Sequence, residues 1–198
     1  MSRYICNSNG PEPIPEEKSM ARKQNQSSVE RSRFTKECIV QALLKLMDEQ
    51  AFSTISIQNI VDAAGVSRMA YYRNFLSKED ILRYHIANVT REYLSMTEDV
   101  RPKNFQEHLQ LLFDYLLEQK DLGLKLNKAG MIALSKEAFD KGMLAYAKDT
   151  KSYYNLCFLS GGLFNMYIFW LDNGCKETPR QLSRYFTKTL HLFNEGDK

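Results

Sequence analysis

Residues 56–82 read SIQNIVDAAGVSRMAYYRNFLSKEDIL. Ser56 is a typical N-cap, and the Ile and Val side chains that follow it recur at helical spacing up to Ala64. Gly65 can end this short helix in a left-handed turn, and Ser67 can cap the next helix. The stretch therefore predicts two short helices joined through an Ala-Gly-Val-Ser turn, as in a helix-turn-helix unit.

Helical spacing of apolar residues continues on both sides of this stretch. Residues 34–50 carry an apolar stripe that includes Leu43 and Met47, and Ser77 with Asp80 opens a long helix downstream. No run of alternating β-branched residues indicates a strand. The predicted fold class is all-α, with an N-terminal three-helix helix-turn-helix domain followed by a C-terminal helical domain.

The second half of the chain carries further helix signals. Pro102 marks a boundary, after which Asn104 caps a fifth helix. Glycines divide residues 122–148 into two or three shorter helices, and residues 152–173 form a long one. The last helix begins with an N-cap, a first-turn proline and a capping-box partner, which are Thr178, Pro179 and Gln181.

The composition excludes several classes of protein. The chain has 198 residues, of which 43% are hydrophobic, enough for a folded core, and its net charge of +3 permits nucleic-acid binding without establishing it. The cysteines and histidines form no ligand spacing, so we expect no disulfide scaffold, metal site or cofactor. No glycine-rich phosphate loop, HExxH or GxSxG motif occurs, and we expect no catalytic residues and no enzyme.

The ends of the chain bear on its location. Residues 1–28 lack the apolar core of a signal peptide and predict a disordered arm, next to which Arg31 and Arg33 could touch phosphates or remain solvated. Residues 153–171 are strongly apolar, but polar residues such as Asn165 interrupt them. This pattern favours a buried interface helix over a membrane span, so we expect no membrane partner and a cytoplasmic protein.

Charge within the helix-turn-helix favours contact with DNA. Arg68, Arg73 and Lys78 are basic, and no acidic residue occurs between Gly65 and Lys78. Each of these charges taken singly is more typical of a solvated helix face. Together they make a helix that can approach phosphates without repulsion.

Residues 56–82 resemble the DNA-binding signature of the TetR family. The resemblance extends over about residues 31–93 and rests on the Ser-opened helix, the Ala-Gly-Val-Ser turn, the Tyr-x-x-Phe end of the second helix and the Lys-Glu-Asp start of the next. Tyr71 stands where the family usually has Phe or Leu. The resemblance implies a DNA-binding transcriptional regulator with a DNA-binding domain over residues 31–93 and an effector-binding and dimerisation domain over residues 94–198. The disordered arm that the composition predicts then covers residues 1–30.

By position, the resemblance implies two kinds of DNA contact. Ser56, Tyr72 and Lys78 would anchor phosphates and set the register, whereas Arg68 and its neighbours would meet base edges or adjacent phosphates. The residues expected at DNA are Ser56, Gln58, Ser67, Arg68, Met69, Ala70, Tyr72, Arg73, Asn74 and Lys78.

Residues 158–174, FLSGGLFNMYIFWLDNG, followed by Thr178 and Pro179, are similar to the C-terminal region of one TetR-like subgroup. In the family the last two helices pair with those of a second subunit as a four-helix bundle. We therefore expect a homodimer bound to a palindromic double-stranded DNA operator. The residues assigned to the dimer interface are Gly161, Gly162, Asn165, Tyr185 and Thr189.

The middle helices of the C-terminal domain are expected to bind a small-molecule effector. The aromatic and Met side chains placed in its pocket, each of which could equally belong to the core, are Phe113, Tyr115, Met131, Phe139, Tyr154 and Phe158. The resemblance implies that the ligand favours a form in which the fourth helix, residues 77–101, holds the two recognition helices at the wrong separation. Such a protein is a ligand-responsive repressor.

Two other functions fit the same helices. A redox-responsive regulator would replace the ligand by oxidation of Cys38, Cys157 or Cys175, although a buried structural role is more typical of each cysteine. A protein-interaction adaptor would keep the fold and use the recognition helix for contacts with another protein. Salt dependence separates the adaptor from a DNA-binding protein, because phosphate contacts weaken steeply as salt rises.

Overall fold

The computed structural model describes residues 15–144 and 147–195, with side chains over residues 28–144 and 147–190. Every regular element in this described part is a helix, which confirms the all-α fold. In chain order the elements are α1 (Pro15–Glu49), the 3₁₀ turn η1 (Phe52–Thr54), α2 (Ile57–Ala64), α3 (Arg68–Asn74), α4 (Lys78–Val100), α5 (Phe105–Glu118), α6 (Lys120–Lys128), α7 (Ile132–Leu144), α8 (Thr150–Asp172) and α9 (Pro179–Glu195). Over the described ranges, none of the helices has the length and apolar character that crossing a bilayer requires.

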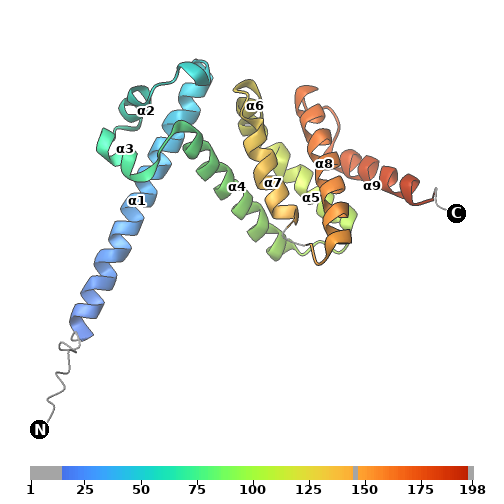
Figure 1. Ribbon diagram of the computed structural model, residues 1–198, viewed down its shortest axis with the longest axis horizontal. Helices are drawn as coiled ribbons and strands as arrows, with labels where there is room; N and C mark the ends of the chain where they lie inside the picture. Colours follow the sequence, from blue (N-terminus) through green and yellow to red (C-terminus); the bar gives the residue numbers. More distant parts are fainter. Residues whose placement is uncertain (1–14, 145–146, 196–198) are drawn as a thin grey trace, which may run out of the picture.

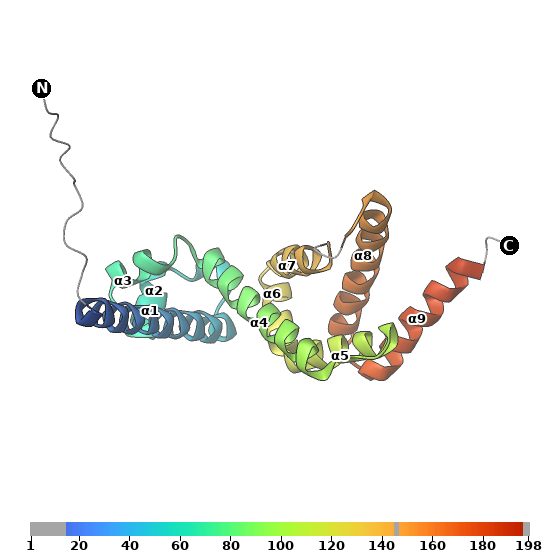
Figure 2. The ribbon, with the colours of Figure 1, turned by 90° about the horizontal axis from the view of Figure 1, so that it is seen from below.

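α4 connects the two parts of the molecule (Figures 1 and 2). At one end of it, α2 and α3 lie beside α1; α5 to α9 lie toward the other end. Within this second part α9 packs along α5, and α7 packs against both α8 and α4. α4 is therefore the helix that joins the helix-turn-helix to the C-terminal helices, and it contacts α1 on one side and α5 and α7 on the other.

α1 begins further toward the N-terminus than the sequence predicted. The apolar stripe placed its start at Phe34, whereas the helix begins at Pro15. Glu, Lys, Met, Ala, Arg and Gln dominate residues 16–26, and these residue types favour helix even where no apolar stripe requires it. Residues 15–30 are thus helical where a disordered arm was expected, and residues 1–14 of that arm lie outside the described residues.

The local signals of the helix-turn-helix are confirmed. The Asn59 backbone N–H donates to the Ser56 hydroxyl at 3.1 Å, and the Ser56 N–H donates to the Asn59 side chain at 2.9 Å. Gly65 ends α2 at a φ of 64°, a left-handed value that glycine adopts without steric strain. The Ala70 N–H then donates to the Ser67 hydroxyl at 3.1 Å. Hydrogen bonds between near neighbours in sequence therefore define both helix starts.

Helix starts outside the helix-turn-helix follow the same logic. The predicted caps at Ser77, Asn104 and Thr178 are confirmed at the starts of α4, α5 and α9. α8 differs slightly, because the cap is the Asp149 carboxylate, which accepts a hydrogen bond from the Ser152 N–H at 2.7 Å. The helix therefore begins two residues before the predicted start at Ser152.

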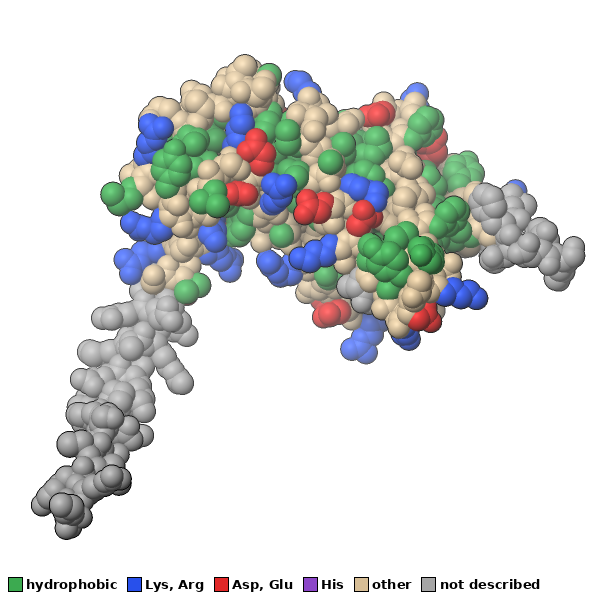
Figure 3. Space-filling model, in the orientation of Figure 1, with side chains coloured by type: hydrophobic (Ala, Val, Ile, Leu, Met, Phe, Trp, Pro, Cys, Tyr) green, Lys and Arg blue, Asp and Glu red, His purple; other side chains and the backbone are tan. Residues whose placement is uncertain are grey.

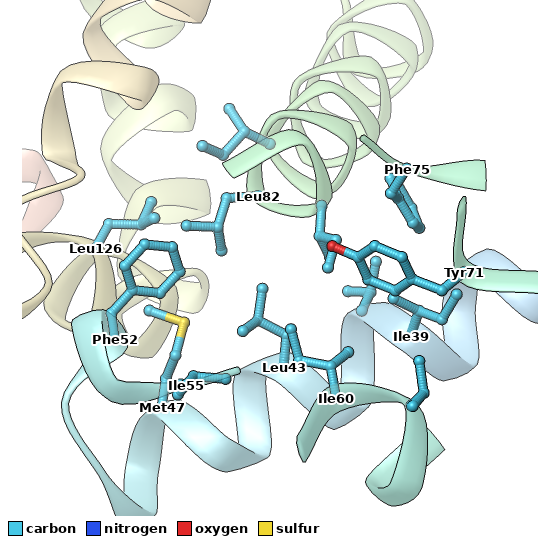
Figure 4. Packing of buried hydrophobic residues seen from close by; sticks show 14 residues of the cluster. Ile39, Leu43, Met47, Phe52, Ile55, Ile60, Tyr71, Phe75, Leu82 and Leu126 are labelled. Carbon is cyan, nitrogen blue, oxygen red and sulfur yellow. The ribbon is translucent and has the colours of Figure 1, made fainter. Parts of the chain in front are cut away.

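A cluster of buried side chains joins α1, α2, α3 and the start of α4 (Figure 4). Ile39 and Leu43 of α1, Ile60 of α2 and Tyr71 of α3 are all inaccessible to solvent. Leu126, which is also buried, enters the same cluster from α6. The cluster thus includes a side chain from the C-terminal part, and the helix-turn-helix is packed against that part.

Lys78 joins the first residue of α4 to the loop between α1 and α2. Its ammonium donates hydrogen bonds to the carbonyl oxygens of Phe52 at 2.5 Å, Ile55 at 3.0 Å and Ser53 at 3.3 Å. The same ammonium lies 4.5 Å from the centre of the Phe52 ring. A charged donor forms stronger hydrogen bonds than a neutral one, so Lys78 holds the start of α4 against the loop that leads into α2.

We expect Lys78→Met to lower the free energy of unfolding by about 1.5–3 kcal/mol, because the aliphatic stem is kept while the hydrogen bonds of a charged donor are lost. Lys125→Met is the control, since its ammonium pairs with Asp48 at the surface and such pairs contribute about 0–1 kcal/mol. Urea unfolding followed by circular dichroism measures both variants. Equal losses in the free energy of unfolding for the two substitutions would show that Lys78 contributes no more stability than a surface lysine.

The Tyr71 hydroxyl is buried and has no hydrogen-bond partner among the described residues. Figure 4 shows it directed into the hydrophobic cluster. Burial in this apolar surrounding raises the pKa of Tyr71 to about 12, with smaller contributions from nearby residues that include Glu79 and Asp80. A buried hydroxyl without a partner costs about 1–3 kcal/mol of stability.

Tyr71→Phe is expected to raise the free energy of unfolding at neutral pH by about 1 kcal/mol, because the ring stays and the unpaired hydroxyl is removed. The pKa of Tyr71 rises from 10.0 to about 12 on folding, so stability linked to this group is fully present below pH 10 and is lost as the pH rises toward 12. Urea unfolding should therefore show a greater loss of stability on the alkaline side in the parent chain than in the variant. Lower stability of Tyr71→Phe at neutral pH would mean that the hydroxyl has a partner in solution.

Candidate nucleic-acid interface and ligand cavity

α3 presents one side to solvent. Met69 is 72% exposed and Tyr72 is 48% exposed, and the side chains of Arg68 and Arg73 are exposed beside them. Tyr71 faces the other way, into the core. The outer side of α3 thus combines two guanidinium groups, a phenol and a flexible apolar side chain, which are groups that bind phosphates, base edges and thymine methyls.

The two serine caps lie at the exposed ends of α2 and α3. Ser56 and Ser67 are both exposed, and a helix N-terminus attracts phosphate through its backbone N–H groups and its dipole. Gln58 is also exposed, but its side-chain amide donates to the Asp62 carboxylate at 2.8 Å. Ala70 is partly exposed on α3. Ser56, Ser67 and Ala70 therefore remain accessible at least in part, whereas the Gln58 amide is engaged by a carboxylate.

Two residues that were expected to contact DNA instead form hydrogen bonds with other residues of the same chain. The Asn74 amide donates to the Ala70 carbonyl at 2.7 Å, and its oxygen accepts a hydrogen bond from the Ser32 hydroxyl at 2.9 Å. The Lys78 ammonium is bound to the loop carbonyls. In this structure Asn74 joins α3 to α1 and Lys78 joins α4 to the loop, so neither polar group is free for a base or a phosphate. Their partners are distant in sequence, which is why the motif did not reveal them.

α1 adds positive charge beside α3. The hydrogen bond from Ser32 to Asn74 places this turn of α1 next to the recognition helix, and Arg31 and Arg33 flank Ser32 with exposed side chains. Figure 3 shows Lys and Arg side chains gathered around this part of α1. Arg31 and Arg33, which the sequence left between solvent and phosphate contact, therefore extend the basic surface of α3. The signal for them was the Arg-Ser-Arg triplet directly before the apolar stripe.

A cavity of about 190 Å³ lies in the C-terminal part, bounded by α4, α5, α6, α7 and α8. Most of the side chains in its walls are apolar. For comparison, an engineered cavity of about 150 Å³ in another protein takes up benzene. This cavity can therefore hold a molecule about the size of one substituted ring.

Three of the six residues expected in the pocket line this cavity: Phe113, Tyr115 and Phe139. The Tyr115 hydroxyl is fixed by donating to the Val89 carbonyl at 2.8 Å. The other three expectations are corrected: Met131 packs against the cluster behind α3, and Tyr154 and Phe158 are 68% and 60% exposed on α8. α8 is apolar on more than one side, so spacing alone did not show which side faces the cavity.

The residues expected at a dimer interface fall into two groups. Four lie partly or fully exposed on α8 and α9: Gly161, Asn165, Tyr185 and Thr189. Gly162 instead faces α9 of its own chain, because a Cβ atom added there would lie 3.3 Å from the Phe186 ring. Gly162 therefore permits close packing within one subunit rather than between two.

The described cysteines are free thiols, with Cys157 exposed and Cys38 and Cys175 half-buried. The expectation of a buried role is thus wrong for Cys157. Burial raises the pKa of the Cys175 thiol, which keeps it protonated and disfavours oxidation there. Of the three, Cys157 is the one most accessible to an oxidant.

Two family models match the chain in the order of its two parts. The model described as bacterial regulatory proteins of the tetR family matches residues 39–84, which contain η1, α2, α3 and the end of α1. A model described as a transcriptional regulator C-terminal region matches residues 103–192, from the start of α5 into α9. Together they cover more than half of the chain.

Two relatives match parts of the chain. The uncharacterized HTH-type transcriptional regulator YuxN of Bacillus subtilis is 26% identical over 152 residues, which are 66% of this chain and 52% of that protein. DhaS of Lactococcus lactis, described as an HTH-type transcriptional activator of the dhaKLM operon, is 28% identical over 93 residues, or 47% of this chain and 49% of its own length. The chain thus spans about half the length of these relatives.

The fold has a counterpart among solved structures. A transcriptional regulator from Aquifex aeolicus matches with a TM-score of 0.50 at 21% identity, over 80% of this chain and 99% of that one. This likeness supports the all-helical fold, and the capped α2–turn–α3 unit supplies the family's DNA-binding element. The chain belongs to the TetR family of bacterial regulatory proteins, which are DNA-binding regulators and not enzymes.

Proposed function

We propose that this chain is a ligand-responsive transcriptional repressor that binds a palindromic operator as a homodimer, with the DNA-binding domain over residues 31–93 and the effector and dimerisation domain over residues 94–198. The observation that carries the proposal is that the hydrophobic cluster behind α3 and the wall of the ligand cavity share side chains. A ligand alters DNA binding only if it interacts differently with two arrangements of the recognition helices, and shared side chains provide such a connection.

Among the buried members of the cluster, Ile86 of α4 and Leu126 of α6 are the ones that also line the cavity. Both belong to the cluster behind α3 and both line the cavity, and each is at most 6% exposed. Because packed interiors resist local compression, a ligand that displaces either side chain moves the helix that carries it. α4 begins at Lys78, which is bound to the loop before α2, so a shift of α4 reaches the helix-turn-helix directly.

An aromatic face on α8 supports the assembly of two copies. Tyr154, Phe158 and Phe169 are 68%, 60% and 70% exposed. Gly161 and Asn165 continue the same helical spacing between them. Figure 3 shows hydrophobic side chains gathered over α8. Exposed apolar surface of this kind marks sites of association, and the family pairs its last two helices across a two-fold axis.

Selection of bound sequences from random duplex DNA is expected to yield an inverted repeat. Arg68→Ala should weaken binding to it by about 10- to 100-fold if the guanidinium meets a base edge. Tyr72→Ala, which removes a phosphate anchor, should weaken binding to all sequences alike. Titrations of labelled duplexes at several salt concentrations measure both effects.

Lys103→Ala is the matched control for these variants, because Lys103 is exposed but lies in the loop before α5, away from α3. It should bind the selected sequence like the parent chain. If the parent chain enriches no sequence even at low salt, the adaptor function becomes the better explanation of the helix-turn-helix.

The direction of regulation has its own test. Repression is the usual outcome in the family, whereas DhaS is described as an activator. A reporter promoter that carries the selected operator should lose activity when this chain is expressed. A rise in reporter activity would contradict the proposed repression and leave DNA binding intact.

Phe169→Asp is expected to convert the dimer into a monomer, because a carboxylate would have to be buried without a partner in the apolar face. Analytical ultracentrifugation measures the change, and operator affinity should fall with it. Leu124→Asp is the control, since Leu124 is 40% exposed on α6 and lies outside this face. A dimeric Phe169→Asp chain would place the interface elsewhere.

A further inference from the structure

The described walls of the cavity in the C-terminal part carry no charged group. Among the described residues that line it there is no Asp, Glu, Lys or Arg. His108 is the one basic side chain in the lining, and burial lowers its pKa below the ordinary value of 6.5, so its ring is neutral at physiological pH. That ring also lies 3.2 Å from the Tyr93 hydroxyl, which shares a hydrogen bond with it. A charged ligand would find no counter-charge in these walls.

Polar groups are nevertheless present in the walls. Tyr167, Gln119 and Ser135 line the cavity, and none of their side chains forms a hydrogen bond within the described part of the chain. Tyr167 itself is only 7% exposed. By contrast, the Tyr115 hydroxyl in the same lining is already used by the Val89 carbonyl. The polar side chains of Tyr167, Gln119 and Ser135 are therefore available for hydrogen bonds with a ligand.

Gly123 makes room for the Tyr167 hydroxyl. A Cβ atom added to Gly123 on α6 would occupy the space of that hydroxyl, and it would also lie 3.1 Å from the Leu171 side chain. Both Gly123 and Tyr167 line the cavity. The Tyr167 phenol thus lies between α8, which carries it, and Gly123 of α6, and its contact with Gly123 restricts where the hydroxyl can lie.

We propose that the effector is an uncharged, mainly hydrocarbon molecule of about one substituted ring that carries a single hydrogen-bonding oxygen, which pairs with the Tyr167 hydroxyl. This inference rests on the proposed function, because it assigns the chemistry of the ligand to which the regulator would respond. Burying a carboxylate or an ammonium among neutral apolar walls carries a desolvation penalty that only a counter-charge could offset. An oxygen of a neutral ligand meets groups that otherwise remain unpaired, and the remaining wall favours its hydrocarbon part.

Four probes of similar shape test the assignment by isothermal titration calorimetry with the purified 198-residue chain in the absence of DNA. They are 4-ethylphenol, ethylbenzene, 4-ethylbenzoate and 4-ethylbenzylammonium. We expect 4-ethylphenol to bind at least about tenfold more tightly than either charged probe, and ethylbenzene to bind with intermediate affinity. Equal affinities of the neutral and charged probes, or no binding by 4-ethylphenol, would overturn the proposal.

Tyr167→Phe isolates the hydrogen bond. It should weaken 4-ethylphenol about three- to tenfold and leave ethylbenzene unchanged, because only the oxygenated probe loses a partner. Tyr153→Phe is the matched control on the same helix, since Tyr153 is 46% exposed and does not line the cavity. If Tyr167→Phe leaves 4-ethylphenol binding unaltered, the assigned pairing is wrong.

Gly142→Leu tests the location. Gly142 lines the cavity on α7, and a Cβ atom added there would meet no atom within 4 Å, so we expect a Leu side chain at this position to have room to extend into the cavity. It should abolish binding of both neutral probes, while Ala133→Leu, at an exposed position of the same helix, should not. Binding that survives Gly142→Leu would place the ligand elsewhere. A chain that shows the expected probe preference but binds no DNA would contradict the proposed regulatory function and leave the ligand assignment standing.

Discussion

The packing of Leu126 into the cluster behind α3 is the constraint on which the rest of the structure depends. The helix-turn-helix is small, and its helices bury their apolar sides only with help from α1, α4 and this side chain of α6. Because Leu126 and Ile86 also line the cavity of the C-terminal part, the core that supports the recognition helix and the wall of that cavity are one continuous packed region. A displacement of either side chain would therefore alter the packing on both sides.

The N-terminal and C-terminal parts of the molecule also differ in the charge of the surfaces that they present. The surface formed by α3 and the adjacent turn of α1 carries exposed arginines and no acidic side chain on α3, which suits a polyanion. The interior of the C-terminal part is walled by neutral groups, which suits an uncharged ligand. Operator and effector would therefore be recognised by opposite physical properties, and neither would compete for the other's site.

Two polar side chains in the N-terminal part show how tertiary structure redefines a motif. Lys78 and Asn74 occupy positions that the family resemblance assigns to DNA, yet their polar groups are used to hold α4 to the preceding loop and α3 to α1. These bonds orient the recognition helix on its neighbours. Tyr71 shows the opposite case, because a hydroxyl enters the core where the family usually has an apolar side chain and has no hydrogen-bond partner among the described residues.

The sequence by itself determined what depends on near neighbours in the chain. The all-α class, the starts of most helices and the left-handed turn at Gly65 follow from caps and spacings a few residues apart, and so does the outward side of α3 that carries Arg68 and Tyr72. Only the tertiary structure decided which apolar side of α8 meets the cavity, where Tyr167 but not Phe158 lines the wall. The reason is that periodicity predicts that a face is buried, whereas the identity of the partner depends on contacts between helices that are distant in sequence.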